Sequence, residues 1–241
     1  MKSQKKKRVS GSSELELPRL RSRKTDAKIL MILSLYLTGK TTLGKIRDKV
    51  DSTPFKVLIS TILSARTKDQ VTEAASERLF ARFPDIESLS RAESETIANT
   101  IRPVLYHNVK SKRLVEVSKR ILENYSGKVP DRLDELIKLP GVGRKTANCV
   151  LVYGFGKPAI PVDVHVHRVS NRIGIVRTKT PEETEAELCS IYEMKYWLDL
   201  NELFVRFGQT TCLPLNPRCE NCPISKYCNY FKFEYQKKPG K

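Results

Sequence analysis

The sequence predicts an all-α protein. Apolar residues recur with the 3.6-residue period of amphipathic helices along most of the chain, whereas strand-like alternation never persists beyond about five residues. There is no internal repeat and no long low-complexity linker. A chain of 241 residues is long enough for one large helical domain or two small ones, each with a buried core.

Several of the predicted helices have recognisable stops, such as the Ser-Gly pair at 126–127 and the Arg-Phe-Pro-Asp run at 82–85. The ranges with helical periodicity are 26–38, 54–64, 68–82, 86–99, 109–124, 131–138, 144–155, 164–173, 181–191 and 197–207.

The charge of the chain favours a polyanionic partner. There are 44 Lys and Arg against 27 Asp and Glu, a formal net charge of +17, and nucleic acid is the commonest partner of so basic a protein. The alternative is a basic protein without such a partner. No apolar run approaches a membrane span, and the N-terminus lacks the apolar core of a secretory signal, so we expect no membrane association and a cytoplasmic or nuclear protein.

The two ends of the chain differ from the rest in composition. Residues 1–23 and 233–241 are basic tails that we predict to be disordered. Four of the six cysteines lie within 212–228, a segment rich in Pro and Asn and without helical period, which indicates a small appended module.

Residues 131–155 are predicted to form helix, glycine hairpin and helix. Gly141 and Gly143 make the turn, and Leu139 and Val142 are its apolar anchors. Backbone N–H groups converge at such a turn and suit a phosphate of any duplex. A purely structural turn between two helices is the alternative.

Lys145 stands in the first turn of the second helix, where the helix dipole disfavours a cation. A nucleophilic amine must be neutral, and the helix start, the neighbouring Arg144 and partial burial are all expected to lower the pKa of Lys145. The placement therefore suits a nucleophile, although it suits a phosphate-binding lysine equally well.

Asp163 is predicted to return to the level of Lys145. Helix 144–155 is about 18 Å long, and the proline-stiffened stretch after it is extended at about 3.3 Å per residue. Asp163 also precedes the next predicted helix, so it is a candidate helix N-cap, a candidate catalyst, or both.

The last four cysteines, Cys212, Cys219, Cys222 and Cys228, have the spacing C-x6-C-x2-C-x5-C. Disulfides are not expected without a secretion signal, so the thiolates would close on one metal centre. From spacing alone, zinc and an iron–sulfur cluster both remain open. We expect Cys149 and Cys189 to be core thiols within helices.

Two motifs together carry a family resemblance. LPGVGRKTAN at 139–148 and VDVHVHRVSNR at 162–172 resemble the endonuclease III branch of the helix–hairpin–helix DNA glycosylases, and the similarity extends from about Phe55 to Cys228. In that branch the lysine after GVGR is the nucleophile and the aspartate of V-D-x-H is its partner. The resemblance thus assigns these roles to Lys145 and Asp163, 18 residues apart.

The resemblance also implies a domain plan and a cofactor. It implies a six-helix barrel over 47–157 and a second helical domain from 24–46 and 158–232. The four C-terminal cysteines then hold a [4Fe-4S] cluster. The implied partner is double-stranded DNA with a damaged base or abasic site, bound by a monomer.

The implied reaction combines glycosylase and lyase steps. The damaged nucleotide flips out of the duplex, Lys145 displaces the base to leave a Schiff base, and β-elimination nicks the strand. The substrates would be damaged, chiefly oxidised, pyrimidines. A mismatch thymine/uracil or 8-oxoguanine glycosylase on the same scaffold is one alternative, and a non-catalytic DNA-binding module is another.

Two loops depart from the family pattern. The family usually carries Gln after residues 61–65, where this chain has Arg66, and its Leu-Tyr-Asn wedge aligns with Tyr106, His107 and Asn108. Arg66 is predicted to face the orphaned base. His165 is expected to make local hydrogen bonds as well as to lie at the DNA. The full predicted DNA-facing set is Leu139, Gly141, Val142, Gly143, Arg144, Arg66, Tyr106, His107, Asn108 and His165.

Overall fold

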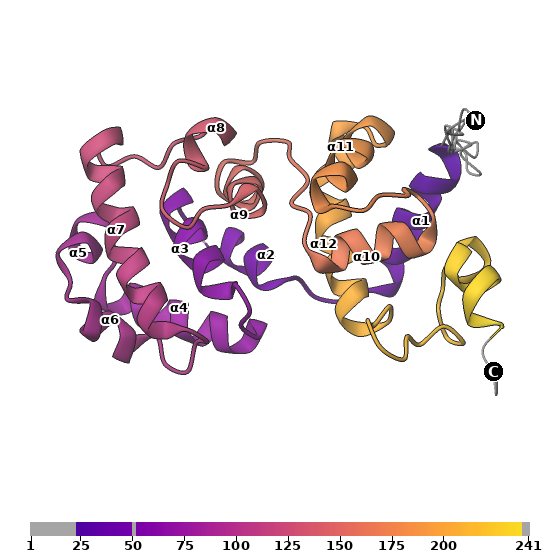
Figure 1. Ribbon diagram of the computed structural model, residues 1–241, viewed down its shortest axis with the longest axis horizontal. Helices are drawn as coiled ribbons and strands as arrows, with labels where there is room; N and C mark the ends of the chain where they lie inside the picture. Colours follow the sequence, from indigo (N-terminus) through magenta and orange to yellow (C-terminus); the bar gives the residue numbers. More distant parts are fainter. Residues whose placement is uncertain (1–22, 50–51, 238–241) are drawn as a thin grey trace, which may run out of the picture.

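The computed structural model describes residues 23–49 and 52–237, and within them it is built from helices and loops with no strand (Figure 1). The α-helices are α1 (Arg23–Tyr36), α2 (Thr42–Arg47), α3 (Pro54–Ser64), α4 (Asp69–Arg82), α5 (Ile86–Arg91), α6 (Ser94–Thr100), α7 (His107–Tyr125), α8 (Leu133–Leu136), α9 (Arg144–Cys149), α10 (Val164–Ile173), α11 (Pro181–Ile191) and α12 (Trp197–Thr210). Shorter turns are η1 (Val150–Gly154), η2 (Met194–Tyr196), η3 (Ser225–Tyr227) and η4 (Phe231–Tyr235). None of these helices combines the length and apolar character that a bilayer span requires.

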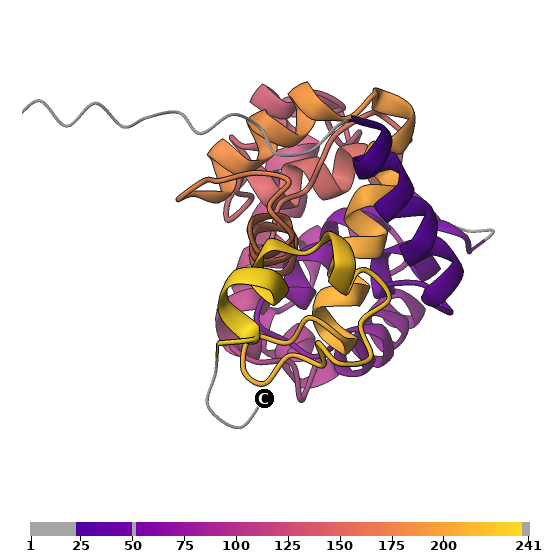
Figure 2. The same cartoon turned by 90° about the vertical axis from the view of Figure 1, so that its right-hand side faces the viewer.

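The helices form two lobes, each around its own apolar core (Figure 1). The core of the first lobe draws on residues 43–159 and includes the fully buried Leu58, Leu79 and Leu114. The core of the second draws on 29–33 and 160–224, with Phe204 and Phe207 at its centre. The second lobe therefore combines a segment from each end of the chain, and Figure 2 shows α1 beside α12.

The helix predictions were best where the chain supplies caps. Ranges 54–64, 164–173 and 181–191 coincide with α3, α10 and α11, whose caps are the side chains of Thr53, Asp163 and Thr180. The single helix predicted over 86–99 was wrong, because residues 92 and 93 are extended and separate α5 from α6. The helix over 131–138 shrinks to α8, and the end of 144–155 continues as the π-helical turn η1.

Helix α2 was not predicted, and it belongs to the first core. Leu43 and Ile46 pack there, although the predicted boundary at residue 46 assigns both to the second domain. Gly44 makes this helix hard to recognise in sequence. A Cβ there would lie 3.0 Å from the Glu202 carboxylate, which accepts from the Thr41 backbone N–H and, at 2.6 Å, from its hydroxyl. We propose to place α2 with the barrel.

The predicted tails fall mostly outside the described residues. Arg23 begins α1, and residues 1–22 and 238–241 are not described. At the other end the prediction of a disordered 233–241 was wrong for residues 233–235. These lie in η4, where Tyr235 is buried and its hydroxyl donates to Glu220 at 3.2 Å.

Candidate active site

The glycine hairpin between α8 and α9 is held by two buried side chains and is open to solvent at Gly143. Leu139 and Val142 are buried, and the Val142 N–H donates to the Leu139 carbonyl at 3.1 Å. Gly141 has φ +71°, and a Cβ there would lie 2.2 Å from the Arg113 side chain. Gly143 has open space where a Cβ would stand. The turn thus presents backbone, with its two apolar side chains directed into the core, as predicted for the anchors.

Helix α9 begins with free amide groups. Its N-cap is Gly143, which has no side chain to accept from them, and the first backbone bond to that residue comes from Ala147 at 2.9 Å. The next residues are Arg144, which is exposed, and Lys145, which is half-buried.

Three groups lie around the Lys145 ammonium: the Cys149 thiol one turn along the helix, and the carboxylates of Asp163 and Asp69. Burial lowers the pKa of Lys145, but Cys149 and Asp163, with a smaller effect of Asp69, raise it, and the net direction is upward. The predicted lowering of the Lys145 pKa was therefore wrong for the protein without DNA. The sequence argument included the helix dipole and Arg144 but could not include partners from elsewhere in the fold.

Asp163 uses one of its two carboxylate oxygens in hydrogen bonds. It is the N-cap of α10, and its Oδ1 atom accepts from the N–H groups of His165 at 2.8 Å and Val166 at 2.9 Å. In the described part of the chain no hydrogen bond reaches Oδ2. The predicted helix cap is confirmed, and it uses only one of the two carboxylate oxygens.

Asp69 was missed as a neighbour of Lys145. It opens α4, and its Oδ2 atom accepts from Gln209 Nε2 of α12 at 3.2 Å, which joins the two lobes beside the site. An acidic residue in the first turn is an ordinary feature of helices, so the sequence offered no signal for a role beyond it.

Arg144 and His165 are held by protein partners. Arg144 makes a two-bond ion pair with Glu185 of α11, at 2.8 and 2.9 Å, across the lobes. His165 Nδ1 lies 3.1 Å from Arg168 Nη2, so the local hydrogen bonding predicted for His165 is confirmed.

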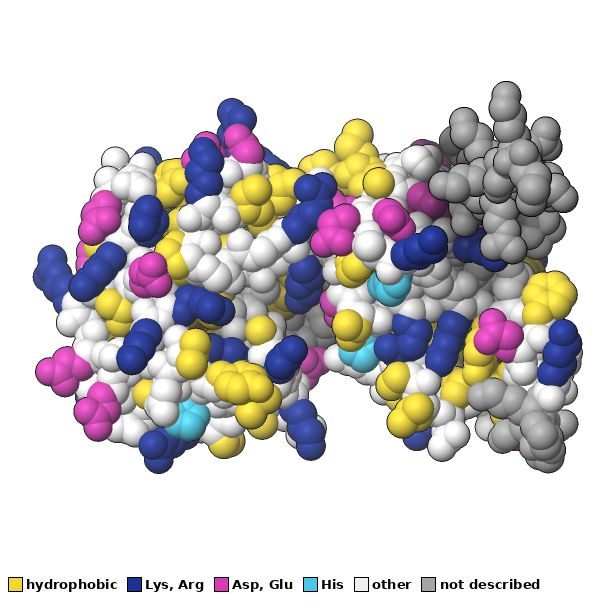
Figure 3. Space-filling view, in the orientation of Figure 1, with side chains coloured by type: hydrophobic (Ala, Val, Ile, Leu, Met, Phe, Trp, Pro, Cys, Tyr) yellow, Lys and Arg dark blue, Asp and Glu magenta, His cyan; other side chains and the backbone are white. Residues whose placement is uncertain are grey.

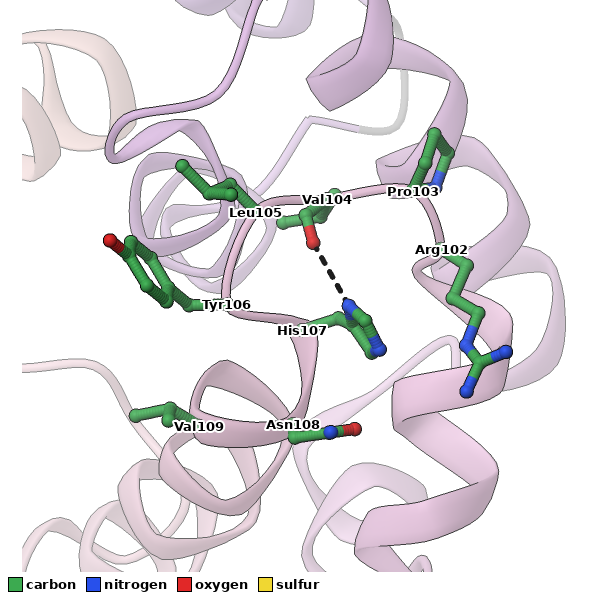
Figure 4. A pocket seen from close by; sticks show the side chains of 8 residues that line it. All are labelled: Arg102, Pro103, Val104, Leu105, Tyr106, His107, Asn108 and Val109. Atoms are coloured by element: carbon green, nitrogen blue, oxygen red, sulfur yellow. Dashed lines mark hydrogen bonds between the residues drawn. The ribbon is translucent and has the colours of Figure 1, made fainter.

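Two loop tips of the first lobe are exposed. Arg66 follows the end of α3 with φ +55°, is exposed, and makes no ion pair among the described residues. Tyr106, with φ +58°, is 54% exposed just before α7, and Figure 4 shows Leu105 and Tyr106 on one side of the loop. His107 points the other way, with its Nδ1 atom 3.2 Å from the Val104 carbonyl. Asn108 is exposed beside it.

The surface around the site is predominantly basic. On the face shown in Figure 3, Lys and Arg side chains lie on both lobes and border the waist between them, while Asp and Glu gather in separate patches. A polyanion laid across the waist would contact both lobes at once.

The four C-terminal cysteines line one small apolar hollow, together with Ile173, Phe207 and Ile224. They form no disulfide. Burial raises the pKa of Cys222 to about 12, and the other three cysteines add to the rise. Arg172 Nη1 also approaches Cys212 Sγ, at 3.7 Å. In the described chain, however, no three His, Cys, Asp or Glu side chains are gathered as tightly as the ligands of one metal ion.

An all-α fold with a helix–hairpin–helix, a lysine in its second helix and a facing aspartate defines a class of DNA repair protein. Residues 59–194, more than half of the chain, match the model of the HhH-GPD superfamily of base excision DNA repair proteins.

Individual relatives narrow the class. The chain is 47% identical over 186 residues to an endonuclease III of Thermotoga maritima, covering 77% of this chain and 87% of that protein. It is 37% identical to an endonuclease III of Bacillus subtilis, with 75% and 83% covered. A solved non-covalent endonuclease III–DNA complex superposes with a TM-score of 0.80 at 30% identity, covering 90% of this chain and all of that one. The chain belongs to the endonuclease III family of helix–hairpin–helix DNA glycosylases.

Proposed function

We propose that Lys145 and Asp163 carry the chemistry of this enzyme, a bifunctional DNA glycosylase/AP lyase of base excision repair. The observation that supports these roles is the meeting of a hairpin lysine with a carboxylate that keeps one oxygen free. A solved structure of a trapped endonuclease III–DNA covalent intermediate resembles this chain at 29% identity with a TM-score of 0.77, covering 88% of this chain and 98% of that one.

Asp163 acts on the proton of Lys145. Because the pKa of Lys145 is raised, its ammonium must lose a proton before it can attack carbon. The free Oδ2 atom of Asp163 accepts that proton and passes it on to the departing base, and the regenerated carboxylate then faces the positive charge on the sugar. The helix cap at Oδ1 keeps the carboxylate oriented throughout.

The reaction then proceeds at the flipped nucleotide. The Lys145 amine bonds to C1′ as the bond from C1′ to the base breaks, and the base leaves with that bond's electron pair. Ring opening and loss of a proton give the Schiff base. Removal of a C2′ proton expels the 3′ oxygen with its strand, and hydrolysis of the remaining imine frees Lys145.

The hairpin and the two loop tips hold the duplex. The turn, which is open at Gly143, and the first amides of α9 bind a backbone phosphate, which positions the protein without reading bases. Arg66 fills the gap left by the flipped base, and Tyr106 inserts from the other side. Arg144, although paired with Glu185, keeps its exposed face toward the same phosphate.

Borohydride trapping on abasic duplex tests the chemistry. Wild type should form a covalent adduct at an abasic site, and Lys145→Gln should lose both trapping and nicking while still binding the duplex, because the amine alone is removed. Arg144→Gln is the matched control, since it removes the neighbouring cation and leaves the amine. Undiminished trapping by Lys145→Gln would place the nucleophile elsewhere.

Arg66 sets the preference for the opposite base. Arginine offers only donors, in a planar fork, and guanine presents the O6 and N7 acceptors that suit it, whereas adenine adds a competing donor. We expect faster cleavage of lesions opposite guanine by about 5- to 150-fold, which covers oxidised and deaminated cytosines. The measurement is single-turnover cleavage of one lesion opposite each of the four bases, for wild type and Arg66→Gln. Equal rates opposite guanine and adenine in wild type would refute guanine readout.

The cysteine module holds a [4Fe-4S] cluster in this proposal. Four soft thiolates around one apolar hollow are the donor set that such a cluster takes, and the nearby Arg172 would offset part of its negative charge. The cluster, when bound, supplies structure to the loop. Anaerobically purified protein should contain iron and inorganic sulfide in equal amounts, and Cys222→Ala should lose both. Active protein with zinc alone would overturn this assignment.

A further inference from the structure

Lys110 occupies a position that the helical pattern reserves for an apolar residue. It lies on α7 in register with the buried Leu114, Val117 and Ile121, and only 4% of its surface is exposed. Lysine is rarely buried to this degree without a paired carboxylate. Burying this charged side chain therefore lowers the stability of the fold, which suggests that Lys110 has a function.

The Lys110 ammonium is bonded by neutral oxygens from one turn. Its Nζ atom donates to the carbonyls of Leu63 and Ala65, both at 2.7 Å, and to the Thr67 hydroxyl at 3.1 Å. All three N–H groups of the ammonium are thus used. Burial, with a smaller effect of Arg113, lowers the pKa of Lys110 to about 8, so the ammonium is still the main form at neutral pH.

These three oxygens belong to residues on both sides of Arg66 in the chain. The turn closes with a 3.0 Å bond from the Thr67 N–H to the Ser64 carbonyl, and Arg66 stands inside it in the left-handed region. Bonds on both sides of Arg66, to Ala65 and Thr67, therefore fix the direction in which the exposed arginine leaves the protein.

The same residue also contacts the second loop tip. Lys110 follows Tyr106 by one helical turn, and its backbone N–H donates to the Tyr106 carbonyl at 2.9 Å. Its side chain thus bonds the turn of Arg66, and its backbone bonds the residue that projects from the other loop. The two exposed tips are joined through one lysine, which crosses from α7 to the end of α3.

We propose that Lys110 is a positioning residue that fixes the spacing of Arg66 and Tyr106, so that both tips enter the two sides of one gap in the duplex. This role rests on the proposed function, in which these tips fill the space around the flipped nucleotide. A displacement of about 1 Å in a positioning group can cost about a hundredfold in rate. The rate gained by a rigid link between the tips can therefore offset the stability lost by burying the Lys110 ammonium.

The test compares duplex with single-stranded abasic DNA. The chemistry of Lys145 acts on an abasic site in either form, but only the duplex has an orphaned base and a gap to fill. Lys110→Met keeps the length of the side chain and removes its donors. We expect this variant to nick the duplex about ten- to a hundredfold more slowly in single turnover, with little change on the single strand and a weaker opposite-base preference.

The matched control is Lys112→Met, because Lys112 is exposed on the same helix and carries the same charge. It should slow both substrates equally through weaker phosphate attraction. Thr67→Val provides a second variant that removes one acceptor and keeps the ammonium. It should give a smaller loss that is also confined to the duplex. Equal behaviour of Lys110→Met and Lys112→Met would overturn the proposal, as would a Lys110→Met defect of the same size on both substrates. Failure of the nucleophile assignment is seen separately, in trapping by Lys145→Gln.

Discussion

Lys145 and Lys110 are two lysines held inside the first lobe, and their surroundings shift their pKa values in opposite directions. Burial lowers the pKa of both. Around Lys145, a thiol and two carboxylates outweigh burial, and the pKa rises. Around Lys110, the partners are two carbonyls and a hydroxyl, and the pKa falls to about 8.

The difference separates the lysine that we propose as the nucleophile from the one that we propose as a positioning residue. A carbonyl holds an ammonium in place but cannot take its proton, whereas a carboxylate can do both. Lys145 thus lies as a cation near the carboxylate that we propose as its base, whereas among the described residues the side chain of Lys110 bonds only carbonyls and a hydroxyl. A lysine pKa that lies close to 7 in the protein without DNA is therefore a poor guide to which lysine is the nucleophile.

The largest expected effect comes from removing that base. Asp163→Asn keeps an oxygen for the N–H groups of His165 and Val166, so the α10 cap survives and the melting temperature should change little. Turnover should fall about 10²- to 10⁴-fold, the usual contribution of general acid–base catalysis.

Whether Asp163→Asn slows or speeds turnover also tests the contrast drawn between Lys145 and Lys110. Asp163 raises the pKa of Lys145, so its loss alone would leave more neutral amine at pH 7. If Asp163 served only to hold the ammonium, nicking by Asp163→Asn would become faster at neutral pH. A large loss of stability with normal turnover per folded molecule would instead reduce Asp163 to a helix cap.

The local parts of this site could be predicted from sequence, and its long-range parts could not. The hairpin anchors Leu139 and Val142 and the cap at Asp163 follow from spacing and residue type over a few positions. Asp69 and Lys110 gave no such signal. An acidic residue at a helix start and a lysine in a helix are both ordinary surface features, and only the packing of distant segments gives these two their neighbours.

Packing of distant segments also explains most of the errors in the predicted fold. Helix α2 carries a glycine because Glu202, far along the chain, occupies the space of its Cβ. The break between α5 and α6 has no proline or glycine to mark it. The direction of the Lys145 pKa depends on Asp163 and Asp69, which come from separate elements of the chain.

A smaller effect is expected from the thiol beside Lys145. Cys149 is buried, and burial raises the pKa of its thiol, so it meets the ammonium as a neutral, weak acceptor. Because Cys149 raises the pKa of Lys145, Cys149→Ala should lower that pKa. The acid limb of the pH profile for borohydride trapping should then move to lower pH, with a several-fold faster rate at neutral pH. Cys149→Ser restores an acceptor, and a stronger one, so its profile should return to that of wild type or move to slightly higher pH. A profile unchanged in Cys149→Ala would exclude the thiol from this role.

The smallest effect concerns the stability cost of Lys110. Its pKa is lowered from 10.5 to about 8, so between these values the unfolded chain binds more protons than the folded one, and this group makes stability rise with pH. Below pH 8 both states are protonated, and the folded state bears the full cost of the buried ammonium. Lys110→Met removes that cost, so its melting temperature relative to wild type should be highest at about pH 7 and should fall as pH rises toward about 10. Thermal unfolding of both proteins across this range measures the difference, with Lys112→Met as the control that should show no such trend. A relative stability of Lys110→Met that rises with pH would mean that the ammonium is stabilised by its three acceptors, and that Lys110 resembles Lys145 in being held as a cation.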